Sequence, residues 1–169
     1  MREAGGFRRD IQGLRALAVV PVVLFHAEPA WMPGGFVGVD IFFVLSGYLI
    51  TQILLKEIRQ GRFSLTGFYV RRVKRLFPAL YAMLAATLAF GAVVLSPADY
   101  AELGRTALAT VAFSSNAMFF SLSDYFDGAA DMKPLLHTWS LAVEEQFYLL
   151  FPLLLAGLSA RAPRLLRPA

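Results

Sequence analysis

Long apolar runs are the feature that most constrains what this sequence can fold into. The segment 36–55 carries a single charged residue, Asp40, and the segments 76–95 and 135–158 are rich in Leu, Ala and Phe. A helix needs about 20 apolar residues to cross the hydrocarbon core of a bilayer. Because only helices and closed barrels satisfy all their backbone polar groups in lipid, we expect an all-α protein that crosses the membrane several times.

The composition agrees with this class and excludes others. The chain is 57% hydrophobic and only 17% charged, whereas soluble domains carry about 25% charged residues. The absence of cysteine excludes disulfides, thiolate metal sites and a cysteine nucleophile. Only two histidines occur, far apart, so we expect no metal site. The net charge of +4 comes from arginines beside apolar runs, a pattern typical of membrane orientation signals and not of nucleic-acid binding.

We predict a polytopic bundle of four or five hydrophobic helices, an incomplete part of a larger bundle, with helices near residues 15–30, 36–55, 76–95, 104–122 and 135–158. The basic stretch 56–75 is expected to be cytoplasmic by the positive-inside rule. The first two helices would then form a hairpin with a cytoplasmic N-terminus. Five full crossings would place the basic tail outside the cytoplasm. Whether the segment 104–122, with Ser114, Ser115 and Asn116 in its middle, fully crosses therefore stays open.

Arg15 and His26 are two ionisable residues separated by apolar residues only. On one helix they share a stripe and lie about three turns apart. Ionisable groups at membrane depth are costly and point to function. A neutral imidazole could accept the proton of a hydroxyl and so act as a general base. The alternative is a structural histidine in the packed interior.

The basic cluster 71–75 contains Arg72 and Arg75 at a spacing of three residues, which places both on one helix face. Guanidinium groups bind phosphates through two parallel hydrogen bonds. One interpretation is therefore a clamp for a phosphorylated cytoplasmic ligand. The other is a positive-inside anchor that contacts lipid headgroups.

A further group of polar residues begins the last apolar run. His137, Ser140, Glu144 and Tyr148 have the spacing of one helix face, which predicts either a polar cavity or a polar seam between helices. Glu145 is interpreted as an interfacial residue. Asp40 would either pair with an arginine or orient His26.

Four stretches together resemble the acyltransferase 3 family of integral-membrane O-acyltransferases. They are the Arg-x10-His of Arg15 and His26, and the segments FVGVDIFFVLSGYLIT (36–51), FYVRRVKRLFPAL (68–80) and LLHTWSLAVEEQFYLLFPLL (135–154). The resemblance covers the chain from about residue 9 to 158. It identifies the chain 1–169 as the N-terminal part of a membrane acyltransferase domain.

The resemblance implies that an acyl-CoA, usually acetyl-CoA, donates an acyl group to a hydroxyl of a cell-surface carbohydrate or similar acceptor. His26 and Arg15 match the family's essential pair, Arg72 and Arg75 match its motif for the CoA phosphates, and Ser140 with Glu144 matches a segment near its pore. It also implies a bacterial plasma membrane and, as partners, further C-terminal helices or an extracytoplasmic hydrolase-like domain. The alternatives are a non-enzymatic membrane protein for transport or structure, and an inactive truncated product.

Overall fold

The computed structural model describes residues 9–121 and 133–161, and all regular structure in these two ranges is helical. The elements are α1 (Arg9–Ala27), the short 3-10 helix η1 (Gly35–Val37), α2 (Gly38–Arg59), α3 (Leu65–Val94), α4 (Pro97–Val111), α5 (Ser115–Ser121) and α6 (Thr138–Arg161). The predicted all-α class is confirmed. The chain divides into two compact units, one up to Gly61 and one from Arg62 onward, and each is described by itself.

Among the described residues, three helical segments are long and apolar enough to cross a membrane: Gly35–Arg59, Leu65–Val94 and Thr138–Ser159. A fourth apolar helix, Gly13–Ala27, is shorter. Large apolar side chains such as Val44 and Val93 point outward from these helices, with exposures of 71% and 85%. A surface of this kind is suited to lipid, so the chain is a membrane protein.

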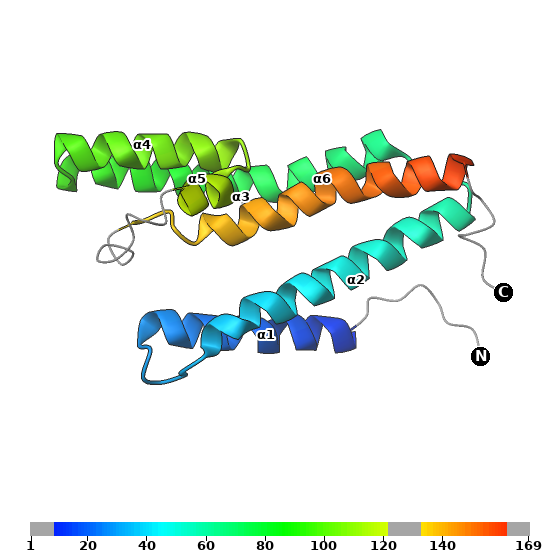
Figure 1. Cartoon of the computed structure of the whole chain (residues 1–169), viewed down its shortest axis with the longest axis horizontal. Coiled ribbons are helices and arrows are strands. Elements are labelled where there is room, and N and C mark those ends of the chain that lie inside the picture. Colours follow the sequence, from blue (N-terminus) through cyan, green and yellow to red (C-terminus); the bar gives the residue numbers. More distant parts are fainter. Residues whose placement is uncertain (1–8, 122–132, 162–169) are drawn as a thin grey trace. The chain divides into compact units, whose positions relative to one another are not determined.

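The first unit is a helical hairpin in which α1 and α2 run antiparallel (Figure 1). Gly34, with a φ of 83°, makes the left-handed turn that leads into η1. Gly35 and Gly38 are buried against α1. A Cβ on Gly35 would lie 2.2 Å from the Pro21 carbonyl oxygen, and one on Gly38 would lie 2.1 Å from the Ala18 carbonyl oxygen. Small residues therefore let the two backbones touch, as is common between membrane helices.

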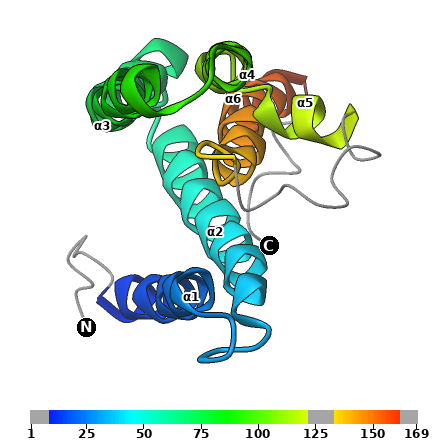
Figure 2. The same cartoon turned by 90° about the vertical axis from the view of Figure 1, so that its left-hand side faces the viewer.

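The second unit is built on α3, which begins at Leu65 and not near residue 76 as predicted. Ser64 caps it, since its hydroxyl oxygen accepts a hydrogen bond from the Gly67 N–H at 3.1 Å. The basic cluster 71–75 therefore lies within the helix. α4 lies beside α3 and α5 beside α6 (Figure 2). The buried residues Leu80, Leu84, Leu103, Ala107 and Leu135 form the apolar core between these helices.

The predicted single helix over 104–122 is wrong. α4 begins at Pro97 and ends at Val111, and α5 starts only at Ser115. Between them, Phe113 has a backbone φ of 50°, a value that residues other than glycine rarely adopt. Hydrogen bonds from α6 stabilise this break, as described below. A continuous helix would have left the polar groups of residues 114–116 without those partners.

Replacing Gly38 with Ala should destabilise the hairpin by about 1–3 kcal/mol, because the added methyl forces α1 and α2 apart. Thermal unfolding of the full-length natural protein in detergent measures this. The matched control is Gly104→Ala, where a Cβ meets nothing within 4 Å, and which should be neutral or slightly stabilising. Equal melting temperatures for the two variants would contradict the close helix contact.

Candidate functional site

The centre of the second unit is an ion pair between Arg72 of α3 and Glu145 of α6. The Arg72 Nη2 lies 2.9 Å from the Glu145 Oε1, and the Arg72 Nε donates to Oε1 at 3.2 Å and to Oε2 at 3.4 Å. The side chain of Glu145 is 9% exposed and that of Arg72 is 21% exposed. Glu145 is therefore a buried, paired carboxylate and not the interfacial residue that the sequence analysis took it to be.

Two further residues of α6 surround the Arg72 guanidinium. Its Cζ lies 3.3 Å from the centroid of the Tyr148 ring, a cation–π contact. The Tyr148 hydroxyl donates to the Glu144 Oε1 at 2.6 Å, and this oxygen lies 3.9 Å from the Arg72 Nη2. Arg72 thus lies over an aromatic face and close to two carboxylates.

The other polar residues predicted near this face lie at the start of α6. His137 precedes the helix, and its carbonyl accepts a hydrogen bond from the Ser140 hydroxyl at 3.0 Å. Ser140 is thus bonded to the backbone at the start of α6 and not to Arg72.

Arg75 lies one turn beyond Arg72 in different surroundings. Its side chain is exposed, and its charge acts on the Glu145 carboxylate without the hydrogen bonds that Arg72 makes. The spacing puts both arginines on one side of α3, but among the described residues only Arg72 is hydrogen-bonded to Glu145.

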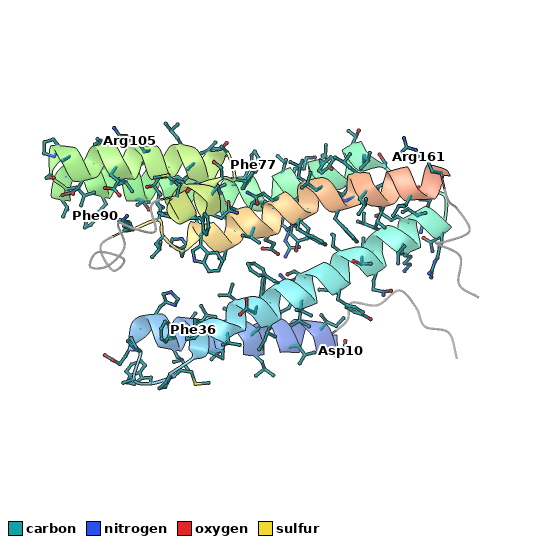
Figure 3. The ribbon with its side chains drawn as sticks, viewed as in Figure 1. Asp10, Phe36, Phe77, Phe90, Arg105 and Arg161 are labelled. Carbon is teal, nitrogen blue, oxygen red and sulfur yellow. The ribbon has the colours of Figure 1, made fainter. Side chains whose placement is uncertain are left out.

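A cavity of about 330 Å³ adjoins the Arg72–Glu145 pair. Its walls are mostly aromatic and aliphatic, and they come from α3, from α6 and from the break between α4 and α5. Phe77, labelled in Figure 3, lies on α3, and its ring centroid lies 6.3 Å from the ring centroid of Phe113. The lining residues are Tyr69, Arg72, Val73, Phe77, Ala112, Phe113, Glu145, Gln146, Tyr148 and Leu149.

Amide side chains hold the helix break that lines this cavity. The Gln146 Nε2 donates to the Phe113 carbonyl oxygen at 2.7 Å and to the Asn116 Oδ1 at 2.9 Å. The Asn116 Nδ2 donates in return to the Gln146 Oε1 at 3.2 Å. Irregular backbone is tolerated at membrane depth only where protein or a cavity satisfies it, and here Gln146 does so.

Buried hydroxyls join the same helices. The Thr110 and Thr138 hydroxyls lie 3.0 Å apart, and the Ser115 hydroxyl donates to the Thr138 carbonyl at 3.0 Å. All three residues are buried. These bonds explain why polar residues interrupt the apolar segment 104–122.

The first unit contains the other predicted site residues. The His26 Nδ1 lies 2.8 Å from the Val22 carbonyl oxygen. A carbonyl only accepts, so Nδ1 carries the proton of the neutral ring and Nε2 is left with a free lone pair. His26 is exposed. Its ring also packs against the Phe25 ring in a T-shaped arrangement, with ring centroids 5.6 Å apart.

Among the described residues, the recorded side-chain hydrogen bond of His26 goes to the Val22 carbonyl and not to Arg15 or Asp40. The Arg15 Cζ lies 4.8 Å from the centroid of the Phe42 ring on α2. Asp40 is exposed in the first turn of α2, where a carboxylate is favoured by the helix dipole. Within residues 9–121 and 133–161 it makes no hydrogen bond or ion pair with either residue.

Sequence reasoning missed Glu145 and Gln146. A signal for Glu145 was present, because a second carboxylate in an apolar run needs a cation as partner. The basic cluster on α3 was the nearest source of one. No comparable signal marked Gln146, whose partners belong to a helix break that was not predicted.

The fold and site define a helical membrane protein whose second unit holds an ion pair between α3 and α6 beside a cavity. The sequence matches the model of the acyltransferase 3 family, described as an acyltransferase domain, over residues 8–167. The chain belongs to this family.

Curated relatives include the O-acetyltransferase OatA of Staphylococcus aureus strain NCTC 8325, which is 44% identical over 153 residues. The peptidoglycan O-acetyltransferase OatA of Listeria monocytogenes is 46% identical over 145 residues. The alignments cover 89% and 85% of this chain, but only 25% and 23% of those proteins. The chain therefore spans about a quarter of the length of these relatives. No solved structure matches it significantly.

Replacing Gln146 with Met should lower the free energy of unfolding by about 1–3 kcal/mol, because the Phe113 carbonyl and the Asn116 amide lose a buried partner. Thermal unfolding of the full-length natural protein in detergent measures the change. Gln52→Met, at an exposed position of α2, is the matched control. An unchanged melting temperature for Gln146→Met would show that the break does not depend on this side chain.

Proposed function

We propose that this chain is part of a bacterial inner-membrane O-acetyltransferase that transfers an acetyl group from acetyl-CoA to a hydroxyl of a cell-surface glycan such as peptidoglycan. The observation that carries the proposal is the 44–46% identity to O-acetyltransferases over most of the chain. The Listeria monocytogenes relative is a peptidoglycan O-acetyltransferase.

His26 is the proposed general base. Its Nδ1 hydrogen bond to Val22 leaves Nε2 to accept the proton of the acceptor hydroxyl. The hydroxyl oxygen then forms a bond to the carbonyl carbon of the thioester. The carbon–sulfur bond breaks, and the CoA thiolate takes the proton back from the imidazolium. Arg15, on the same helix, is the proposed positioning residue for the donor or for His26.

The donor is proposed to bind from the cytoplasm at the basic end of α3. Tyr69 donates to the Leu149 carbonyl at 2.7 Å, and Arg72 pairs with Glu145. These two contacts show that α3 and α6 run antiparallel. The start of α3 and the basic end of α6 at Arg161 therefore lie at one end of the unit. The positive-inside rule places that end in the cytoplasm.

This topology supports a cytoplasmic N-terminus. α4 has 15 residues and α5 has seven, and each is too short to cross a bilayer that needs about 20. If α4 and α5 do not cross the membrane, α3 crosses it away from the cytoplasm and α6 crosses it back. The basic tail then no longer falls outside the cytoplasm.

The cavity beside Arg72 offers a place for the uncharged arm of the donor. Its aromatic walls suit an apolar or neutral chain, and the phosphates would remain at the exposed basic residues of α3. Glu144, Tyr148, Ser140 and His137 are proposed to line the path between this cavity and the acceptor. Asp40 is proposed as a supporting residue of the first unit.

Replacing His26 with Ala in the full-length natural protein should reduce acetyl transfer by at least about a hundredfold, because a general base contributes 10²–10⁴-fold. Transfer of radiolabelled acetyl groups from acetyl-CoA in membrane vesicles measures it. Protein level in the membrane fraction and the melting temperature should match those of the natural protein. Retained transfer would contradict the assignment of His26 as the base.

A further inference from the structure

We propose that the two arginines of the Arg-x-x-Arg motif have different roles: Arg75 contacts the phosphates of the acyl-CoA, whereas Arg72 is a positioning residue held by Glu145. This inference rests on the proposed function, because it concerns the donor site of that reaction. It assigns a role to Glu145, which the sequence analysis left at the membrane interface.

The first argument is charge. The Arg72 guanidinium is bonded to the Glu145 carboxylate through Nη2 and Nε and lies 3.9 Å from a Glu144 oxygen. A phosphate that approached Arg72 would meet two carboxylates around one cation. Like charges at such distances repel more strongly in a low-dielectric interior than in water, so this position is unfavourable for a CoA phosphate.

The second argument is burial. Glu145 is 9% exposed. Removing one partner of a buried ion pair is strongly destabilising, because it leaves the other charge uncompensated. A phosphate that drew Arg72 away would have this effect on Glu145. Arg75 is exposed. Its charge acts on Glu145, but the hydrogen bonds of the Glu145 carboxylate go to Arg72. A phosphate can therefore bind Arg75 without breaking the Arg72–Glu145 pair.

The third argument is the place of the pair in the cavity wall. Arg72, Glu145 and Tyr148 all line the cavity. The Arg72 guanidinium fixes the register of α3 against α6 through its hydrogen bonds to Glu145, and it packs on the Tyr148 ring. A change in this pair would displace the wall that positions the donor's reacting end. We therefore expect it to alter the rate of transfer more than the affinity for acyl-CoA.

The test is steady-state kinetics of the full-length natural protein in membranes, with acetyl-CoA varied at a saturating hydroxyl acceptor. Arg75→Gln should raise the KM for acetyl-CoA about tenfold with kcat within about twofold, as expected for a lost phosphate contact. Arg72→Gln and Glu145→Gln should each lower kcat about a hundredfold with little change in KM, as for a misplaced reacting group.

A double-mutant cycle tests whether Arg72 and Glu145 act as a pair. The double variant Arg72→Gln/Glu145→Gln should lose no more kcat and no more melting temperature than either single variant, because the second change removes a charge that is already unpaired. Glu102→Gln is the matched control. Glu102 also pairs across elements, with Lys133 at 3.3 Å, but is 47% exposed, so its loss should leave kcat and KM unchanged.

A second variant covers the case in which Arg72→Gln fails to insert. Arg72→Lys keeps the positive charge but lacks the planar fork. It should lower kcat as Arg72→Gln does, whereas Arg75→Lys should retain most of the affinity for acetyl-CoA.

The proposal is overturned if Arg72→Gln raises KM as much as Arg75→Gln while Glu145→Gln lowers KM. That result would show Arg72 to be a phosphate ligand weakened by a neighbouring carboxylate. Absence of acetyl-CoA-dependent transfer in the unmutated protein would instead refute the proposed function and the role of Arg75. The melting temperatures of the three variants would still test whether Arg72 and Glu145 act as a pair. A double variant whose loss of melting temperature equals the sum of the two single losses would contradict the pairing.

Discussion

The Arg72–Glu145 ion pair is the interaction on which the arrangement of α3 and α6 depends. Both residues lie within helices that are long and apolar enough to cross a membrane, where an unpaired charge is expensive. The Arg72 guanidinium binds the Glu145 carboxylate through both Nε and Nη2. This geometry allows one relative register of the helices, because a shift along either helix axis would separate the guanidinium from the carboxylate. Tyr148 and Tyr69 add contacts that agree with that register.

The same need for polar partners explains the broken helix beside this pair. A continuous helix over residues 104–122 would satisfy its own backbone. The break at Phe113 is stable because Gln146 satisfies the freed carbonyl and Asn116 together. Discontinuous helices in membrane proteins commonly mark binding sites near the middle of the bilayer. Here the break, the ion pair and the cavity share residues of one unit, which is why we propose that the donor binds there.

Hydropathy was sufficient to predict the all-α class and the region of the three long helices, since that signal is local to each segment. It was not sufficient for the start of α3. The basic cluster 71–75 resembled an interfacial loop until the partner of Arg72 on α6 was known. The roles of Glu145 and Gln146 depend on contacts with Arg72 and Phe113, which are far away in the sequence. Hydropathy and motif spacing do not report such tertiary contacts. The roles predicted for all the site residues remain predictions: Arg15, His26, Asp40, Arg72, Arg75, His137, Ser140, Glu144 and Tyr148.

The most direct test of the account is an experimental structure of the full-length natural protein with acetyl-CoA bound. We predict that the Arg72 Nη2 and the Glu145 carboxylate remain in contact and that the CoA phosphates lie against Arg75, with the pantetheine arm in the cavity lined by Phe77 and Tyr148. A structure in which a CoA phosphate takes the place of Glu145 on the Arg72 guanidinium would contradict it.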